Sequence, residues 1–585
     1  MTINRLPWQA LVPDSESWQE LFAQPVIPEP QLVSFSAVQM RLSYGLQQFC
    51  HPARCADYML IRSPEEGEYL TTVASVIRAI WNAPQKLTGG HYQIDGATVT
   101  FRPAESPEDN FAARGEVVVA DWVEPDQVFG CLRQFDGQLS LSPGLIHQAN
   151  GGILILSLRS VLAQPLLWLR LKQMLEQQRF DWLSPDETSP LPVSVPSMPL
   201  SVKLILLGDR EALADFQEME PEISYDALYS EFEDVLTIDD EDAVSQWMKW
   251  LGAVAREHHL PLPQADAWAE LVREAVRFTG DQALFPLCPV WIARQLKEVS
   301  LTSDGETFSG EQFRNMLLQR EWRESYLSER MQDEILQEQI LIETEGEQVG
   351  QINALSVIEF PGHPRAFGEP SRISCVVHTG DGEFTDIERK AELGGNIHAK
   401  GMMIMQAFLM SELQLEQQLP FSASLTFEQS YSEVDGDSAS MAELCALISA
   451  LANVPIQQSI AITGSVDQFG RVQPVGGLNE KIEGFFRICQ QRGFTGNQGA
   501  IIPGTNVRHL SLHPDVLEAV ENEQFFLWAV DDVADALMLL TRLPWDGEGR
   551  QTLIQLIQER ISAIQNDGRN RYPWPLRWLN WFNHN

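Results

Sequence analysis

Short apolar runs punctuate the first 240 residues. Residues 57–61, 151–158 and 202–209 are almost continuously apolar, which is typical of strands buried on both faces. A helical pattern starting at residue 35 precedes them, and the run at 57–61 leads through a loop into a further helix. We therefore expect an α/β domain with an alternating sheet over 35–240, preceded by an irregular segment rich in Pro and Trp at 1–34.

Between 241 and 338 the apolar residues recur at helical spacing. Val244, Trp247, Leu251 and Val254 define a first amphipathic helix. Further helices are predicted over 265–278, 290–299 and, as one long helix, 310–339. An acidic run at 231–242, with seven carboxylates in twelve residues, is interpreted as a solvated linker that marks the boundary of this helical subdomain.

From 339 to 545 the patterns predict both strands and helices, and we expect an α+β domain. The predicted strands are 348–360, 373–378, 424–431 and 499–503, and the predicted helices are 439–453 and one that has Lys481 in its first turn. The remaining residues, 546–585, begin with a helix at 551–564 and end in a Trp-rich stretch. We expect so much aromatic surface to pack on the chain or on a neighbouring subunit.

Composition excludes several classes of protein. The 585 residues carry 81 acidic and 41 basic side chains, a net charge of −40, which argues against a nucleic-acid partner. There is no run of eighteen apolar residues, so we expect no membrane span. Seven scattered cysteines favour a reducing, cytoplasmic location. The cluster from Cys50 to Cys55 offers three possible zinc ligands, but ordinary buried thiols are favoured and we expect no metal.

Ser438 lies where a turn rich in Gly and Asp leads into a helix. The free amides of a first helical turn can hold an oxyanion, which a serine nucleophile requires. The alternative is a helix N-cap serine, which the local sequence alone favours.

Lys481 likewise allows either a catalytic or a structural interpretation. It is one of only eight lysines and the only one after Lys400. A desolvated lysine can act as a general base, whereas arginine stays protonated. The alternative is a solvated helix lysine.

Three ordered blocks connect these two residues to a known family. The segments 427–431 with 435–440, 461–465 and 473–481 resemble the active-site blocks of Lon proteases in their B-type form, and the 43-residue separation of Ser438 and Lys481 matches the family's dyad. The resemblance is good over roughly 340–545 and weaker before it. The whole chain is similar to bacterial members of the family whose AAA+ module is degenerate.

The resemblance implies roles for four residues. Ser438 would be the nucleophile and Lys481 its general base, with Thr463 orienting the amine and Asp435 modulating its charge. Lys400 matches no dyad position, and His398 and Lys400 are either substrate contacts or an ordinary polar helix start. The nucleophile-elbow and penicillin-binding motifs are not matched, because Ser440 and Met441 occupy the required Gly and Lys positions.

The predicted phosphate loop of the AAA+ module lacks its chemistry. A phosphate loop needs glycines and a lysine, yet Glu65, Glu66 and Glu68 surround Gly67, and Glu68 stands at the lysine position. Ser157 stands where an aspartate would hold Mg²⁺. We therefore expect no cofactor and no ATP hydrolysis, although a non-hydrolytic ligand site stays open.

Together these features predict a serine endopeptidase that cleaves unfolded proteins or peptides without ATP hydrolysis. The resemblance implies self-association, as a hexameric ring with the dyads inside. Two alternatives stay open: a binding or scaffold ring with latent proteolysis, and, less favoured, a working AAA+ remodeller.

Overall fold

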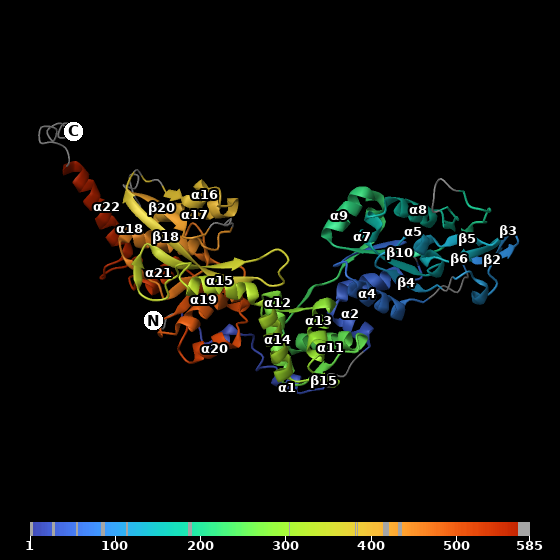
Figure 1. Ribbon diagram of the computed structural model, residues 1–585, viewed down its shortest axis with the longest axis horizontal. Helices are drawn as coiled ribbons and strands as arrows, with labels where there is room; N and C mark the ends of the chain where they lie inside the picture. Colours follow the sequence, from blue (N-terminus) through green and yellow to red (C-terminus); the bar gives the residue numbers. More distant parts are fainter. Residues whose placement is uncertain are drawn as a thin grey trace. The chain divides into compact units, whose positions relative to one another are not determined.

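The computed structural model describes residues 4–570, apart from 26–29, 54–55, 83–87, 113–114, 185–189, 304, 381, 383, 414–420 and 431–435. The chain forms two compact units (Figure 1). Unit 1 comprises residues 1–20, 266–285 and 309–585, and unit 2 comprises residues 21–265 and 286–308. The polypeptide therefore passes between the units several times.

Unit 2 is built on a five-stranded parallel sheet in the order β11-β1-β10-β7-β4. The apolar runs predicted as strands form its centre, as β1 (Tyr58–Arg62), β7 (Ile153–Ser157) and β10 (Lys203–Gly208), and the edges are β4 (Val117–Ala120) and β11 (Leu228–Glu231). Because the strands are parallel, the loops that follow β1, β7 and β10 meet at one edge of the sheet.

Helices cover this sheet and extend unit 2. The helices of the sheet region include α2 (Gln31–Val38), α3 (Met40–Cys50), α4 (Gly67–Ile80), α7 (Leu158–Leu162), α8 (Pro165–Glu176), α9 (Arg210–Met219) and α10 (Pro221–Asp226). Two hairpins, β2 (Gly90–Asp95) with β3 (Thr98–Pro103) and β5 (Cys131–Phe135) with β6 (Gln138–Ser142), add to it. The helices α11 (Glu241–Glu257) and α13 (Pro289–Ser300) also belong to this unit.

Unit 1 contains a seven-stranded mixed sheet in the order β19-β20-β18-β17-β22-β25-β26. Its strands are β17 (Gln351–Ile358), β18 (Phe367–Thr379), β19 (Phe384–Asp386), β20 (Phe421–Phe427), β22 (Ile460–Ile462), β25 (Gly499–Pro503) and β26 (Phe526–Val530). Residues 4–6 lie against this sheet, because the Leu6 amide donates to the Leu527 carbonyl and the Ala529 amide donates to that of Asn4.

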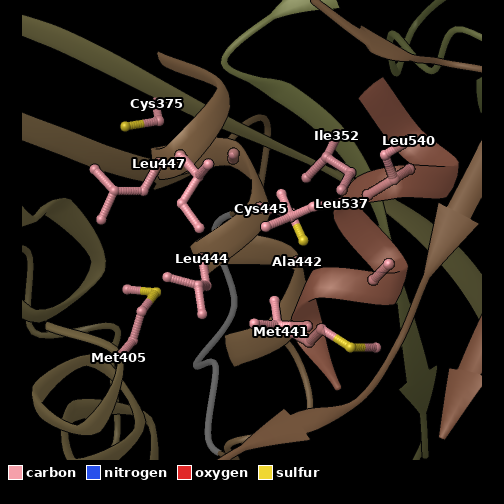
Figure 2. Close-up of a cluster of buried hydrophobic side chains, with 14 of the residues drawn as sticks. Ile352, Cys375, Met405, Met441, Ala442, Leu444, Cys445, Leu447, Leu537 and Leu540 are labelled. Carbon is pink, nitrogen blue, oxygen red and sulfur yellow. The ribbon is translucent and has the colours of Figure 1, made fainter. Parts of the chain in front are cut away.

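Two helices cover opposite faces of this sheet. Successive strand residues point to opposite faces, and Ile501 packs in the core of α18 (Ser440–Ala452), whereas Ala500 and Ile502 pack in the core of α19 (Leu478–Arg492). Figure 2 shows the α18 core, where Met441, Leu444 and Cys445 lie among side chains of neighbouring elements. The sheet therefore separates α18 from α19 and fixes both.

Further helices complete unit 1. They include α12 (Ala267–Thr279), α14 (Gly310–Glu324), α15 (Tyr326–Leu336), α16 (Ile387–Lys390), α17 (Asn396–Leu413), α20 (Pro514–Glu521), α21 (Val533–Thr541) and α22 (Leu553–Asn570). Arg560 of α22 donates to the Ala450 and Leu451 carbonyls at the end of α18, at 2.6 and 3.0 Å. The Trp-rich end beyond residue 570 lies outside the described residues.

The prediction of one long helix over 310–339 is wrong. The helix ends at Glu324 and a second one starts at Tyr326. Between them the Ser325 hydroxyl lies 3.1 Å from the Trp322 carbonyl and 2.6 Å from the Glu329 carboxylate, and it can donate to either. Serine hydroxyls compete in this way with helical backbone bonds, which accounts for the break.

Across the described ranges, no helix is both long and apolar enough to cross a membrane.

Candidate functional site

Ser438 lies in the turn that leads into α18. The helix begins at Ser440 and its N-cap is Ala439, with no capping bond from a side chain. The Ser440 amide instead donates to the Asp437 carbonyl at 3.0 Å. The N-cap alternative for Ser438 is therefore wrong, and its hydroxyl is not used to start the helix.

Backbone hydrogen bonds tie this turn to the segment after β22. The Gly464 amide donates to the Ser438 carbonyl at 2.9 Å, and the Met441 amide donates to the Gly464 carbonyl at 3.1 Å. Among the described residues, the amides of Ser438 and Ala439 have no acceptor. These two amides are therefore available to hold an oxyanion.

Lys481 lies in the first turn of α19. Gly477, the N-cap, has φ +63°, and a side chain there would collide with Val357. One turn beyond Lys481, a Cβ at Gly484 would collide with the Gly368 carbonyl oxygen of β18. Glycine is therefore required at both positions, because it permits the left-handed start of the helix and its close approach to the sheet.

The Lys481 amine is withdrawn from water. The residue is only 4% exposed, so the solvated-lysine alternative is wrong. Desolvation lowers the pKa of the amine from 10.5 to about 8, while the negative charges of Asp437 and Glu480 act in the opposite direction. A substantial fraction of the amine is therefore neutral near pH 8.

Thr463 links the two residues. The Lys481 amine donates to the Thr463 hydroxyl at 3.4 Å, and that hydroxyl donates to the Ser438 carbonyl at 3.4 Å. Thr463 is fully buried, and its amide donates to the Ile501 carbonyl at 3.1 Å. Within the described residues, no hydrogen bond joins the Ser438 hydroxyl directly to the Lys481 amine. Such contacts are often long before a substrate binds.

An acidic residue that the sequence analysis did not single out also belongs to this site. Asp435 lies outside the described residues. Of the two carboxylates whose charges act on Lys481, Asp437 has a larger effect than Glu480, and it accepts a hydrogen bond from the Ser465 hydroxyl at 2.8 Å. Its position directly before Ser438 is a signal that the sequence alone offered.

His398 and Lys400 of α17 differ in their surroundings. His398 is 1% exposed, and its Nε2 lies 3.1 Å from the Asp386 Oδ2 and 3.8 Å from the Glu443 Oε1. Burial alone would lower its pKa, but the nearby carboxylates of Asp386 and Glu443 raise it. His398 is therefore a buried ionic contact rather than a substrate contact, whereas Lys400 is exposed.

The loop between β1 and α4 carries Glu65, whose carboxylate is hydrogen-bonded to residues at the end of β7. Glu65 accepts hydrogen bonds from the Ser157 hydroxyl at 2.7 Å and from the Arg159 amide at 3.0 Å. Its other oxygen lies over Gly208, at the end of the strand between β1 and β7. Glu65 thus spans the edge of the sheet where the strand-end loops meet.

The helix α4 begins with Gly67 and Glu68, directly after the loop that carries Glu65. Gly67 is the first residue of the helix, and the Glu68 carboxylate lies 3.8 Å from the Lys297 amine of α13. The position predicted to lack the phosphate-loop lysine therefore holds an acidic side chain that pairs within its own unit.

Metal ligands do not gather in the part of the chain that the structure describes, where no group of three or more His, Cys, Asp or Glu has suitable geometry. Cys55 lies outside the described residues, so the expectation of ordinary thiols rather than a metal site at Cys50–Cys55 stays a prediction.

Comparison with known proteins places both sheets in one family. Residues 118–226 match the model of the LonB-like AAA domain, and residues 431–540 match that of the Lon protease (S16) C-terminal proteolytic domain. The first match covers β7 and β10, and the second covers Ser438, Thr463 and Lys481. The fold is thus a multidomain α/β and α+β architecture with an AAA region and a Lon proteolytic domain.

Individual relatives support the same assignment. The chain is 68% identical over 583 residues to a Lon protease homolog of Escherichia coli, covering 100% of both chains. It is 42% identical to a Lon protease homolog of Haemophilus influenzae, covering 97% of this chain and 95% of the relative. The archaeal Lon protease of Pyrococcus abyssi is 26% identical over 72% of this chain and 41% of its own. The chain belongs to the Lon protease family.

Proposed function

We propose that the protein is a serine endopeptidase that uses Ser438 as nucleophile and Lys481 as general base. The observation that carries this proposal is the buried amine of Lys481, whose pKa of about 8 makes it a usable base in mildly alkaline solution. Thr463 supports the assignment, because its hydroxyl accepts from the amine and donates to the backbone of Ser438.

The reaction follows the logic of a nucleophile, a base and an orienting group. The Ser438 hydroxyl transfers its proton to the neutral amine of Lys481 as its oxygen attacks the peptide carbonyl. The oxyanion that forms accepts hydrogen bonds from the amides of Ser438 and Ala439. The ammonium then gives the proton to the leaving amine, and water hydrolyses the acyl enzyme by the same steps. The charge of Asp437, together with that of Asp435 as the family resemblance implies, tunes the amine.

We further propose that proteolysis proceeds without ATP hydrolysis. The residues after β1 do not fit a nucleotide, because Glu65 places a carboxylate at the sheet edge and Glu68 replaces a cation with an anion. Ser157, which donates to Glu65, supplies no carboxylate for Mg²⁺. Without a motor the enzyme would act on peptides and unfolded proteins.

Family membership and composition motivate the remaining proposals. We propose that the chain assembles into a ring, as a hexamer with the dyads inside, and that it works in the reducing cytoplasm. Cys375, Cys445 and Cys489 are free thiols in the described core, which suits such a compartment. Mass photometry of the purified protein would test the subunit number.

The direct test is cleavage of an unfolded fluorescent casein by the purified protein without nucleotide, beside Ser438→Ala. We expect cleavage by the wild type and none by the variant, whether or not Mg-ATP is added. Equal cleavage by both proteins would contradict the assignment of Ser438. Strong stimulation by ATP would contradict the proposed independence from nucleotide.

A second candidate function is a binding or scaffold ring with latent proteolysis. It is favoured by the Glu65 carboxylate at the place where a nucleotide phosphate would bind, and by the absence of a direct Ser438–Lys481 hydrogen bond among the described residues. No cleavage by either protein in the casein assay would support this alternative. Pull-down of client proteins would then be the next measurement.

A further inference from the structure

The helix that carries Lys481 is held from outside the proteolytic core by charged side chains of α12 and α14. On α19, Glu483 and Arg487 are four residues apart and so share one face. Glu483 pairs with Arg277 of α12, and Arg487 pairs with Glu321 of α14. The charges are reciprocal, since α19 offers an acid to one helix and a base to the other.

The contact between Arg277 and Glu483 is the more completely satisfied of the two. The guanidinium donates to both carboxylate oxygens, at 2.6 and 3.1 Å, and also to the Ser511 carbonyl at 3.0 Å. The Glu483 carboxylate accepts a further bond from the His513 amide at 2.8 Å. Burial acts to raise the pKa of the Glu483 carboxyl, but the Arg277 charge and hydrogen bonds keep it below its usual value.

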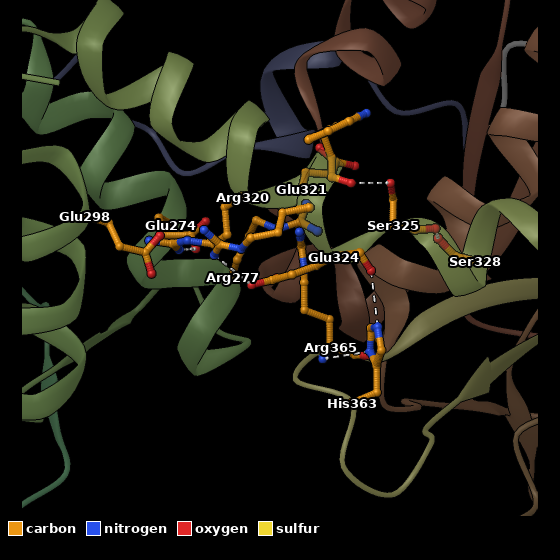
Figure 3. Close-up of polar contacts among 12 residues, drawn as sticks. Glu274, Arg277, Glu298, Arg320, Glu321, Glu324, Ser325, Ser328, His363 and Arg365 are labelled. Atoms are coloured by element: carbon orange, nitrogen blue, oxygen red, sulfur yellow. Dashed lines mark hydrogen bonds and ion pairs between the residues drawn. The ribbon is translucent and has the colours of Figure 1, made fainter. Parts of the chain in front are cut away.

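The two outer helices act as one support. Arg320 of α14 lies 3.3 Å from the Glu274 carboxylate of α12, and Figure 3 shows Arg320, Glu274 and Arg277 gathered together. The Glu321 carboxylate, which pairs with Arg487, also lies 3.5 Å from the His513 Nε2. Neither α12 nor α14 can therefore move without disturbing the contacts of α19.

A second ion pair between the same two helices does not involve α19. Arg314 of α14 lies 2.7 Å from the Glu270 carboxylate of α12, and the Arg314 side chain is half-exposed. It offers a matched control, because its loss weakens the pairing of α12 with α14 without removing a partner of α19.

We propose that Arg277 is a positioning residue for Lys481. Its bidentate bond to Glu483, two residues after Lys481, fixes the first turns of α19 and so fixes the amine opposite Thr463. Helices that precede the proteolytic domain in sequence thereby control the placement of its base. The inference rests on the proposed function in one respect, namely that Lys481 is the base.

Loss of Arg277 has a defined physical consequence. Glu483 would be left as a buried carboxylate without its counter-charge, which is strongly unfavourable. The start of α19 would shift or admit water to restore solvation. Lys481 would then lose part of its desolvation, and its amine would hold its proton to higher pH.

The test compares Arg277→Met with Arg314→Gln in the full-length protein, using a fluorogenic peptide. For Arg277→Met we expect kcat to fall about 10²-fold with little change in KM, because small displacements of a catalytic group have such effects. We also expect the midpoint of the pH–rate profile to rise by about one unit as the amine becomes hydrated. Arg314→Gln should match the wild type in both respects, and Arg277→Lys should recover part of the rate.

A second measurement does not depend on activity. Hydrogen exchange of the amides in α19 is compared for Arg277→Met and Arg314→Gln in the Ser438→Ala background, at a temperature where both proteins are folded by circular dichroism. Faster exchange at 478–484 in Arg277→Met alone would support the proposal. Unchanged exchange there, or an unshifted pH profile in an active variant, would overturn it. If the wild type showed no Ser438-dependent cleavage, the proposed function would be overturned instead. The exchange data would still show whether the Arg277–Glu483 pair holds the start of α19 in place.

Discussion

The Lys481 amine lies 3.4 Å from the Thr463 hydroxyl, inside a site where the lysine is only 4% exposed. The two residues are 18 positions apart and come from α19 and from the segment after β22. A buried amine with a hydroxyl acceptor and a lowered pKa is the arrangement that a lysine base requires. In unit 2, the contact between the Glu65 carboxylate and the Ser157 hydroxyl has a comparable importance for the proposed loss of nucleotide binding.

Replacing Lys481 by Met should abolish most of the peptidase activity. We expect the rate to fall about 10²–10⁴-fold, the usual contribution of a general base. The thermal midpoint at pH 7 should stay the same or rise, because Met fills similar space without a charge that is costly to bury. Peptide hydrolysis and differential scanning calorimetry measure the two effects. Lys400→Met, at an exposed lysine of α17, is the control, and an equal loss of activity there would contradict the assignment of the base.

Activity should increase with pH and level off above about pH 8, because the neutral form of Lys481 is the base. Stability follows the same group. Its folded pKa lies below the unfolded value of 10.5, so the unfolded state binds more protons between about pH 8 and 10.5. The penalty of burying the ammonium is therefore complete below about pH 8 and disappears as the pH rises through this window. Melting curves of the wild type and of Lys481→Met across this range should converge toward high pH.

Replacing Asp437 by Asn should move the pH–rate profile to lower pH. The Asp437 charge raises the pKa of the Lys481 amine, so its removal lets the amine lose its proton earlier. The Asn side chain still accepts a hydrogen bond from Ser465. Glu521→Gln, at an exposed carboxylate of α20, should leave the profile unchanged. A shift of Asp437→Asn toward higher pH would show that the carboxylate acts in another way.

Replacing Thr463 by Val should reduce both activity and stability. The variant keeps the shape of the side chain but removes the acceptor of the Lys481 amine and the donor to the Ser438 carbonyl. Leaving buried polar groups unpaired costs about 1–3 kcal/mol, which denaturant titration would detect. Thr463→Ser keeps the hydroxyl and should retain most of the activity. Equal rates for Thr463→Val and the wild type would argue that the hydroxyl does not orient the base.

Restoring the acidic residue at position 157 should destabilise unit 2 rather than create a Mg²⁺ site. The Ser157 hydroxyl donates to Glu65 at 2.7 Å, so Ser157→Asp would set two carboxylates against each other. Ser157→Asn has the same size without the charge and should be better tolerated. Melting temperatures measured with and without Mg-ATP would compare the variants, and adding Glu65→Gln to Ser157→Asp should recover stability. Stabilisation of Ser157→Asp alone by Mg-ATP would contradict the proposed loss of the nucleotide site.

Sequence patterns predicted the elements that carry the site. The strand before Ser438, the helix after it and the strand at 499–503 appear as β20, α18 and β25, because local apolar periodicity and turn residues define each of them. The same local reasoning was wrong for the helix over 310–339, where the Ser325 side chain interrupts the backbone bonds. Local patterns also left open whether His398 contacts substrate. Its carboxylate partners, Asp386 and Glu443, come from other elements, so a local pattern does not reveal them.

By itself the sequence determined which chemistry was available. It placed a serine at a helix start, a rare lysine 43 residues later, and glutamates in a loop where nucleotide binding would require a lysine. Tertiary structure alone decided how these groups are used. Burial of the Lys481 amine, the reach of Glu65 to Ser157 across 92 residues, and the pairing of Arg277 with Glu483 across 206 residues all depend on distant segments meeting. Desolvation and charge pairing act through space, so no local pattern of residues encodes them.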